Sequence, residues 1–444
     1  MTTRAVIERP ADDVFATTPL GRDTQSRQIT VAQFCADVAL ASRTLPACRH
    51  VINLCQSRYG FMVVFFAVAS SGRINLLPGK RDAESARQLA ERYQDCTTVS
   101  DDAAAGADVL VNVQPGSNGE AAIPLIDDAA VVAIAFTSGS TGEPQPHRKT
   151  WAMFGQWRHV HWEHVPDELR RPGRIVATVP PWHMYGLEWS MLLPTVAPLT
   201  IHCGPDFYPR DVAEAMETWP GETLLVSTPL HLRALVRGAA PRGRTAMVVC
   251  ATAPLEPALT QEVESKLHTR LYEIYGCSEI GSLAWRCPAM DQDWRFFNCF
   301  QPVINDGVVT IEHRELPAAV TLPDLFSEGA NGGMQLLGRS TDVVKVGGKR
   351  ESLAHLNAVL VSMPDVLDGV FYLPEDLGLA STGRLGALAV APGIDVRELR
   401  SRLAAALDPV FLPRPLHLVP ELPRDVSSKL KRESLRRLVE RLNG

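Results

Sequence analysis

The sequence lacks the features that would assign it to a membrane or nucleic-acid-binding class. Its strongest apolar run, at 61–69, is shorter than the roughly 20 residues that span a bilayer and has the length of a buried core helix. A net charge of −6 provides no overall attraction to nucleic acid or anionic lipid. Repeats and low-complexity tracts are also absent. We therefore expect no nucleic-acid partner and no stable membrane insertion.

Paired cysteines are missing as well. The nine cysteines are an odd number, and no two have the Cys-x-x-Cys spacing that many zinc and redox sites use. Because no secretory signal peptide precedes them, we expect reduced thiols, a cytoplasmic location and no zinc site.

What the sequence does contain is a series of short apolar runs separated by helix-like stretches. Its 444 residues, 45% of them hydrophobic, suggest two or three domains. Runs of strand length occur at 51–55, 109–113, 129–136, 174–179, 222–228, 245–250 and 270–275, and helical patterns at 30–42, 59–71, 209–218 and 257–267. This alternation predicts an α/β fold with a large multi-layer N-terminal domain and mainly parallel sheets.

The pattern changes after about residue 300. Strands become short and hairpin-like, and two helical patterns follow at 353–362 and 395–407. We place a boundary near 338–342. The sequence thus predicts a core domain over residues 1–339 and a small α+β domain over residues 340–444.

A turn rich in glycine and hydroxyl groups directly follows one buried strand. Residues 136–144 read FTSGSTGEP, so the turn carries Thr137, Ser138, Gly139, Ser140, Thr141 and Gly142. Glycines let backbone N–H groups approach an anion closely, and the hydroxyls add donors without bulk. An ordinary turn has a similar composition, and the Gly-Lys-Ser/Thr ending of a mononucleotide P-loop is absent. The segment is a candidate phosphate loop of another kind.

Two further segments place polar groups after strands. PPWHMYGLEW at 180–189 surrounds His183 with aromatic residues, although a core histidine would have the same neighbours. EIYGCSEIG at 273–281 places Ser278 and Glu279 at the end of a strand. A hydroxyl and a carboxylate at such a position can hold a phosphate oxygen and Mg²⁺. A helix N-cap is the alternative.

Two basic segments complete the set. GRSTDVVKVGGKRES at 338–352 alternates cations with valine and glycine, as a charge-protected edge hairpin also would. LPRDVSSKLKRESLRRLVERL at 422–442 places Lys429 on a loop before a basic amphipathic helix, where a solvated helix end is the alternative. Each segment alone is a weak signal, but their order along the chain is specific.

In this order the segments resemble the motifs of the adenylate-forming superfamily, which includes acyl-CoA synthetases, aryl-acid ligases, luciferases and peptide-synthetase adenylation domains. The resemblance runs from about residue 50 to the C-terminus. FTSGSTGEP is similar to the phosphate loop, YGCSE to the Tyr-Gly-x-Thr-Glu motif, GRSTDVVK to Gly-Arg-x-x-Asp-x-x-Lys and PRDVSSK to Pro-Arg…Lys. The resemblance implies an enzyme with two half-reactions. A carboxylate first attacks the α-phosphate of Mg²⁺-bound ATP, and a thiol, usually pantetheine, then takes the acyl group.

The resemblance also implies roles for individual residues around the nucleotide. Contacts to ATP would come from the 137–142 loop, Ala251, Thr252, Ala253, Tyr275, Gly276, Ser278, Asp324 and Arg339. Tyr275 would stack on the adenine, Asp324 would accept the ribose hydroxyls, and Glu279 would hold Mg²⁺. Lys429 would bridge the carboxylate and α-phosphate oxygens as charge develops, a task that suits a compact ammonium on a long stem.

The acid and the thiol would contact other residues. By resemblance, His183 gates the acid pocket, whose wall would include Trp182, Tyr185, Trp189, Gly281 and Leu283. The small domain would rotate between the half-reactions, so that Lys429 leaves and a thiol-binding face with Lys345, Gly347 and Gly348 arrives. Catalytic roles would fall to Lys429, His183, Arg339 and Ser278.

Several positions depart from the family pattern. Gln145 stands where the phosphate loop usually continues with lysine, which leaves Arg148 or Lys149 as the source of that charge. Thr341 stands at the expected hinge, and Ser428 replaces the glycine before the catalytic-type lysine. The continuation QPHRKTW resembles a subgroup of short AMP-ligases of aryl-polyene and xanthomonadin-type pigment pathways, which charge an aryl or acyl acid onto an acyl carrier protein.

The favoured hypothesis is therefore an ATP-dependent acid–thiol ligase that acts on an aromatic acid such as a hydroxybenzoate and on an acyl carrier protein. Two alternatives remain: an acyl-CoA synthetase for aryl or medium-chain fatty acids, and a homologue that binds nucleotide or acyl groups without turnover. An amino-acid adenylation domain would need an acidic pocket residue to pair the substrate ammonium, and none is evident near His183 or Tyr185.

Overall fold

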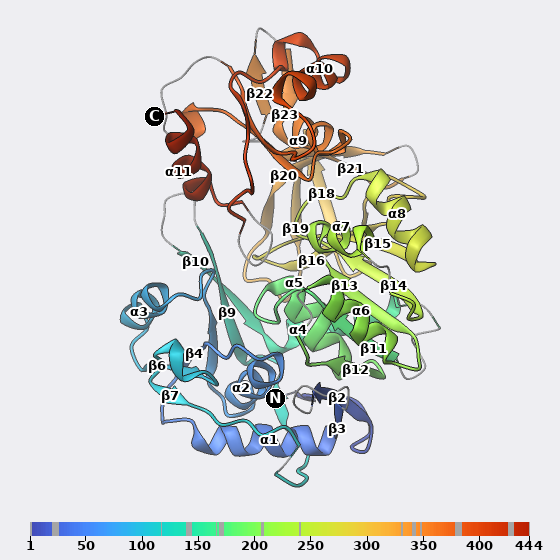
Figure 1. Cartoon of the computed structure of the whole chain (residues 1–444). Coiled ribbons are helices and arrows are strands. Elements are labelled where there is room, and N and C mark those ends of the chain that lie inside the picture. The colour runs from blue at the N-terminus through green and yellow to red at the C-terminus, as the bar shows by residue number, and fades with distance from the viewer. Residues whose placement is uncertain are drawn as a thin grey trace.

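Two large sheets form the N-terminal part of the chain (Figure 1). The computed structural model describes residues 2–19, 26–116, 118–138, 144–165, 167, 173–205, 208–238, 241–329, 332–339, 343–346, 349–377, 384–424 and 430–443, and every structural statement concerns these residues. Both sheets are mainly parallel, which confirms the predicted α/β class.

The six-stranded sheet has the order β10-β9-β5-β4-β6-β7. Its strands are β4 (His50–Asn53), β5 (Ile74–Leu77), β6 (Cys96–Ser100), β7 (Val109–Leu110), β9 (Val131–Ser138) and β10 (Pro144–Thr150). β10 returns antiparallel to β9, whereas β4 to β7 and β9 run parallel. The helices of this part are α1 (Val31–Thr44), α2 (Arg58–Ser70) and α3 (Ala83–Arg92).

Helix α2 contains the apolar run at 61–69 and is buried on all sides, as predicted. The helix begins where the Ser57 hydroxyl accepts a hydrogen bond from the Gly60 N–H, which satisfies one of the free donors of the first turn. Its aromatic rings pack on distant parts of the chain, with Phe65 6.4 Å from Phe154 and Phe66 6.5 Å from Trp151 between ring centroids. No helix among the described residues is long and apolar enough to span a membrane.

The nine-stranded sheet has the order β17-β16-β15-β14-β13-β11-β12-β2-β3. Its strands are β2 (Val14–Pro19), β3 (Ser26–Thr30), β11 (Gly173–Ala177), β12 (Leu199–His202), β13 (Thr223–Ser227), β14 (Thr245–Cys250), β15 (Arg270–Cys277), β16 (Gly281–Arg286) and β17 (Arg295–Phe296). The helices along this stretch are α4 (Trp151–Glu163), α5 (Met184–Leu187), α6 (Pro209–Glu217), α7 (Pro229–Arg237) and α8 (Pro257–Leu267), and turns of π- and 3₁₀-helix at 188–195 continue α5.

A four-stranded antiparallel sheet follows, with β18 (Gln301–Asn305), β19 (Val308–Glu312), β20 (Val320–Glu328) and β21 (Met334–Arg339). A small pair, β1 (Thr3–Ala5) and β8 (Leu125–Asp127), joins the N-terminus to the middle of the chain. The C-terminal residues form β22 (Val343–Val346), β23 (Lys349–Ser352), α9 (Leu353–Ser362), β24 (Asp368–Tyr372), β25 (Gly386–Val390), α10 (Val396–Ala406), β26 (Leu416–Leu418) and α11 (Arg432–Asn443).

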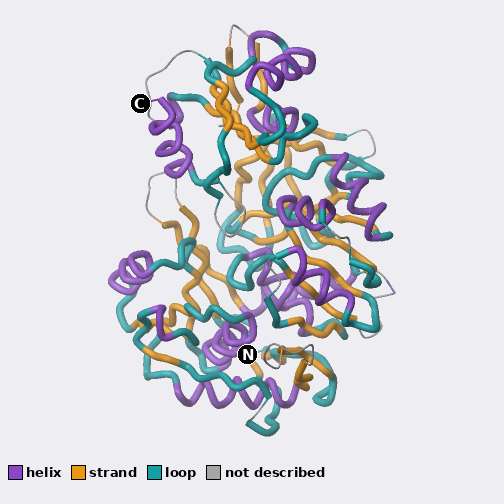
Figure 2. The backbone as a smooth tube through the Cα atoms, viewed as in Figure 1, coloured by secondary structure: helices purple, strands orange, loops and turns teal. Residues whose placement is uncertain are grey.

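The C-terminal residues lie at one end of the molecule, opposite α1, and contain both helices and strands (Figures 1 and 2). Two clusters of buried apolar side chains belong to this end, one over 344–416 and one over 372–439. One contact to the rest is a hydrogen bond of 3.2 Å from Arg233 of α7 to the carbonyl of Leu367. The boundary near 338–342 stays a prediction.

The sequence patterns missed some elements and overextended others, such as the strand predicted at 174–179, which ends at Ala177. The strand predicted at 109–113 ends at Leu110, and α3, α4, α7 and the β2–β3 hairpin were not predicted. Helices such as α4 are hard to find in the sequence because apolar and polar residues are mixed around their whole circumference. The predicted helices at 257–267 and 353–362 are confirmed over their full lengths.

Burial of a histidine in α4 leads to a prediction about stability. His161 stacks on Trp189, with ring centroids 4.5 Å apart, and burial lowers the pKa of His161 to about 3. Between pH 6.5 and that value the unfolded chain binds a proton that the folded chain excludes, so the free energy of unfolding falls as the pH falls. Relative to His161→Phe, the wild type should lose about 1.5 kcal/mol between pH 6.5 and pH 5.

Denaturant unfolding at several pH values measures this difference. The exposed His355 provides the control, because His355→Gln should leave the pH profile of the wild type unchanged. Parallel profiles for the wild type and His161→Phe would contradict the prediction.

Candidate active site

Three residues of the predicted nucleotide site meet where β15 faces the four-stranded sheet. The hydroxyl of Tyr275 donates a hydrogen bond of 2.6 Å to Oδ2 of Asp324. Asp324 of β20 lies opposite Arg339 of β21 in the antiparallel register. The Tyr275 ring packs edge-on against Trp294 and Phe326, with centroids 5.8 and 5.3 Å away. The predicted adenine and ribose contacts are therefore neighbours.

Ser278 and Glu279 lie on the turn between β15 and β16. The turn spans 278–280, so the hydroxyl and the carboxylate follow a strand as predicted, and the helix N-cap alternative is wrong. Both side chains are half-buried. Gly276, next to the last residue of β15, lies at a crowded point, where a Cβ would stand 2.4 Å from the carbonyl oxygen of Gly281. The turn is thus tightly packed at its base and reaches solvent at its tip.

The hairpin of the predicted phosphate loop lies beside this turn. Its strands β9 and β10 pair Ser138 with Pro144, so the loop between them starts and ends at one place. On β10, Nε2 of His147 lies 3.8 Å from Oε1 of Glu279. The strand that follows the predicted phosphate loop is therefore adjacent to the predicted metal ligand.

The segment predicted to line the adenine contains a strained residue. Ala251, Thr252 and Ala253 directly follow β14, and Thr252 has φ = +86°, a value that β-branched residues seldom adopt. The Thr252 hydroxyl is buried and has no hydrogen-bond partner among the described residues. Strain and an unsatisfied buried polar group are both frequent at ligand sites. The segment is therefore suited to contact a ligand.

His183 and Trp182 precede helix α5 and are both half-buried. The His183 N–H donates to the carbonyl of Pro180 at 3.2 Å, and the His183 carbonyl accepts from Leu187. The guanidinium of Arg81 lies 4.0 Å from the centre of the Trp182 ring, a cation–π contact that fixes this indole. His183 is thus held by its backbone and has part of its surface accessible.

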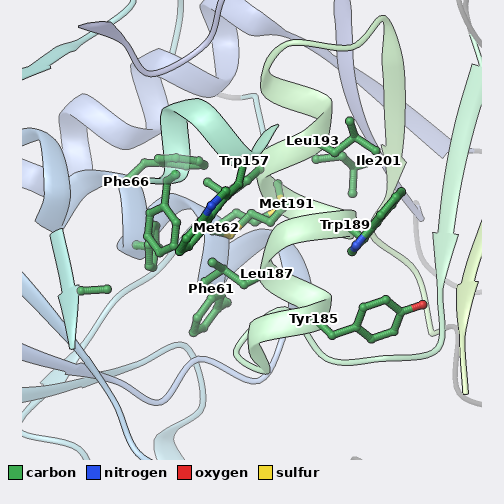
Figure 3. Close-up of a cluster of buried hydrophobic side chains, with 14 of the residues drawn as sticks. Phe61, Met62, Phe66, Trp157, Tyr185, Leu187, Trp189, Met191, Leu193 and Ile201 are labelled. Carbon is green, nitrogen blue, oxygen red and sulfur yellow. The ribbon is translucent and has the colours of Figure 1, made fainter. Parts of the chain in front are cut away.

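The other aromatic residues of this segment are in the core (Figure 3). Tyr185 donates to the carbonyls of Ser227 and Val249 at 3.2 and 2.7 Å, and burial raises the pKa of Tyr185 well above its usual value. Trp189 and Leu283 are completely buried. These three side chains are therefore core residues, whereas Trp182 and His183 have accessible surface. The contact of all five with the acid stays a prediction.

Two ionisable side chains, those of Lys149 and Glu188, lie buried beside the turn. The sequence patterns did not predict a role for both of them. Lys149 was one of two candidates for the phosphate-loop charge, and Glu188 had no role. Arg148 is exposed, but Lys149 is buried and its Nζ donates to the carbonyls of Glu279 and Ile280 at 2.7 and 3.0 Å. Burial lowers the pKa of Lys149 and raises that of Glu188, and the charge of each opposes the shift of the other. Glu188 could have been noticed as a lone acid within the apolar run GLEWSMLLP.

Several predicted site residues lie outside the described residues. These are Gly139, Ser140, Thr141, Gly142, Thr341, Gly347, Gly348, Ser428 and Lys429, and only the backbone is described for Thr137, Ser138, Arg339 and Lys345. Their roles at the phosphates, the hinge, the thiol and the reacting carboxylate stay predictions.

Comparisons with known proteins agree with this geometry. The family model for AMP-binding enzymes matches residues 38–318. A 4-coumarate–CoA ligase of Halorhodospira halophila is 27% identical over 307 residues, which cover 66% of this chain and 74% of that protein. A 4-coumarate–CoA ligase of Rhodobacter capsulatus is 28% identical over 286 residues, which cover 62% of this chain and 68% of that protein.

Solved structures share the fold. The o-succinylbenzoate CoA synthetase of Bacillus subtilis in complex with its acyl-adenylate intermediate has a TM-score of 0.79 at 16% identity, and the match covers 98% of each chain. The family match covers more than half of this chain and includes the segments at 136–144, 180–189 and 273–281. It confirms the adenylate-forming superfamily and the enzyme class, an AMP-forming carboxylate–thiol ligase. The chain belongs to the AMP-binding enzyme family.

Proposed function

We propose that this ATP-dependent acid ligase activates an aromatic carboxylic acid, such as a hydroxybenzoate, and transfers the aryl group to the pantetheine thiol of an acyl carrier protein in the cytoplasm. The activity class rests on the family. The observation that supports the proposed site most is the convergence of Tyr275, Asp324 and the Glu279 turn beside the phosphate-loop hairpin.

The described side chains suit the binding of ATP. The hydrogen bond from Tyr275 orients Asp324, whose remaining acceptor capacity suits the ribose hydroxyls, while the Tyr275 ring would stack on the adenine. Ser278 would donate to the α-phosphate. Glu279 provides the hard oxygen ligand that Mg²⁺ prefers, and the ion would supply charge neutralisation at the phosphates.

Adenylate formation brings two negative groups together. A carboxylate and a triphosphate repel, so cations and oriented dipoles must hold them in contact. We propose Lys429 and Arg339 for this task, with residues 340–444 as a mobile domain that carries Lys429. In the second half-reaction, the face with Lys345, Gly347 and Gly348 would replace Lys429 at the site.

The aromatic substrate has two supports. The first support is that the relatives from Halorhodospira halophila and Rhodobacter capsulatus are 4-coumarate–CoA ligases, and coumarate is an aromatic acid. In addition, the accessible groups beside His183 include the ring of Trp182. Aromatic walls also accept alkyl chains, so medium-chain fatty acids are the alternative substrate.

The acceptor has less support than the acid. The proposal of a carrier protein rests on the resemblance of QPHRKTW to the short pigment-pathway ligases and on the basic C-terminal helix. Within α11, however, Arg436 and Arg437 lie 3.4 and 3.1 Å from Glu433, which compensates part of this charge. CoA is therefore the second candidate, and the names of the relatives favour it. Nucleotide binding without turnover is the third possibility.

Pyrophosphate exchange with a panel of acids tests the first half-reaction. We expect exchange with hydroxybenzoates at a kcat/KM at least tenfold above that for medium-chain fatty acids. A folded protein that binds ATP but exchanges with none of the acids would be a homologue without turnover. Thioester formation with CoA and with a holo-carrier protein in parallel then identifies the acceptor, and a preference for CoA would overturn the proposed carrier.

Removal of the Tyr275 hydroxyl tests the nucleotide site. Tyr275→Phe keeps the ring but loses the bond that orients Asp324, so the KM for ATP should rise about tenfold at a nearly constant KM for the acid. The half-buried Tyr272 of the same strand provides the control, because Tyr272→Phe should leave both constants unchanged. Equal effects of the two substitutions on ATP would contradict the assignment.

Removal of the Lys429 ammonium tests the first half-reaction. Lys429→Ala should lower the rate of adenylate formation at least 100-fold, since it deletes a charge needed only as the adenylate forms. Lys431→Ala, two residues further on, is the control and should keep most of the activity. Normal pyrophosphate exchange by Lys429→Ala would show that the lysine has been assigned wrongly.

A further inference from the structure

Lys149 and Glu188 are two opposite charges buried on either side of the turn that carries Ser278 and Glu279. Lys149 has no exposed surface, and Glu188 has 1% of its surface exposed. Burial of a charged group is costly unless the group makes compensating hydrogen bonds. The contacts of these two side chains therefore show what the charges do.

Lys149 holds the carbonyl side of the turn. Its ammonium donates hydrogen bonds of 2.7 and 3.0 Å to the carbonyl oxygens of Glu279 and Ile280. The centre of the Trp157 ring lies 5.4 Å from the same nitrogen. A single cation thus fixes two successive peptide groups, one of which belongs to the proposed metal ligand.

Glu188 holds the amide side of the turn. Its Oε2 accepts hydrogen bonds from the N–H and the hydroxyl of Ser282 at 3.0 and 2.5 Å. The Ser282 hydroxyl also accepts a bond of 3.2 Å from Nε1 of Trp189, which orients it toward the carboxylate. The carboxylate therefore fixes the residue at which β16 leaves the turn.

Gly281 allows the carboxylate to come this close. Its φ of +129° lies in a region that favours glycine, and a Cβ at this position would stand 2.0 Å from Oε1 of Glu188. The backbone of 279–282 is thus held from two sides by side chains from β10 and from the helical segment after α5. An ordinary hairpin turn at a surface has no such supports.

We propose that Lys149 and Glu188 are positioning residues, which clamp the backbone at 279–282 and thereby aim the Glu279 carboxylate at the cation bound to ATP. The inference rests on the proposed function, because that proposal assigns the turn to ATP and Mg²⁺. Both side chains are buried, so they would act without contact to the nucleotide. They act by keeping a metal ligand in one orientation, as outer-shell partners do in other metal sites.

A merely structural role for the two charges predicts a different result from a positioning role. Lys149→Met leaves the buried carboxylate without its counter-charge and should lower both stability and ATP binding. Lys149→Met/Glu188→Gln removes both charges, retains an acceptor for Ser282, and should recover the part of the stability lost to the unpaired charge. If the pair only compensated charge, the double variant would also recover ATP binding.

The experiment measures the affinity of the intact chain for ATP by calorimetric titration, once in the presence of Mg²⁺ and once in the presence of EDTA. The melting temperature of each variant is measured alongside. We expect the double variant to melt above Lys149→Met but below the wild type, because the carbonyls of Glu279 and Ile280 still lack their donor. It should bind ATP about tenfold more weakly in Mg²⁺ and equal the wild type in EDTA. Lys266→Met is the control, since Lys266 also donates to a backbone carbonyl, that of Val236, away from the turn. Wild-type affinity of the double variant in Mg²⁺ would overturn the inference.

A milder substitution covers the case in which the lysine variants do not fold. Ser282→Ala removes one of the two bonds to Glu188 and should weaken ATP binding in Mg²⁺ about threefold while leaving binding in EDTA unchanged. An unchanged affinity in both media would overturn the inference. A different result would show that the proposed function itself is wrong: the wild type would then show no ATP binding that depends on Mg²⁺.

Discussion

The reversal of direction after β15 is the constraint on which the candidate site depends. Up to this strand the nine-stranded sheet runs parallel from β2, and β16 then returns antiparallel through a turn of three residues. A buried return leaves peptide groups that water cannot reach, and each must find a partner. Lys149 supplies the donor for two carbonyls and Glu188 the acceptor for an N–H, so the turn is rigid at its base. Ser278 and Glu279, at the tip of the turn, are therefore attached to a rigid base.

Most of the architecture could be predicted because it depends on local patterns. The strand-length apolar run at 245–250 and the helix at 257–267, which begins with a proline, have the same bounds in the structure. The motif at 273–281 falls at a strand end as expected. The approach of Tyr275 to Asp324 and Arg339 followed from the family resemblance alone, since β15 is separated in the sequence from the consecutive strands β20 and β21.

The remainder depends on contacts that no local pattern encodes. Lys149 has the spacing of any polar residue on a β-strand, and only the fold places its ammonium under carbonyls 130 residues further on. Glu188 lies in an apolar run, and its carboxylate can be buried because the N–H of Ser282 donates a hydrogen bond to it. The same carboxylate is the acidic residue near Tyr185 that the sequence analysis did not find. Because it is committed to Ser282, it gives no support to an amino-acid substrate.

The dense aromatic packing around α2 has a consequence for biosynthesis. The rings of Phe65 and Phe66 are covered by Phe154 and Trp151, and Phe61 by Trp182, so the partners of the most apolar segment are translated much later than the segment itself. At about 5–20 residues per second, the nascent chain carries this segment uncovered for several seconds after it leaves the ribosome. A run with four aromatic or β-branched residues in sequence and no charge is prone to intermolecular strand pairing during that interval. The yield of soluble protein should therefore depend on chaperone supply and on the rate of translation more than on the stability of the finished fold.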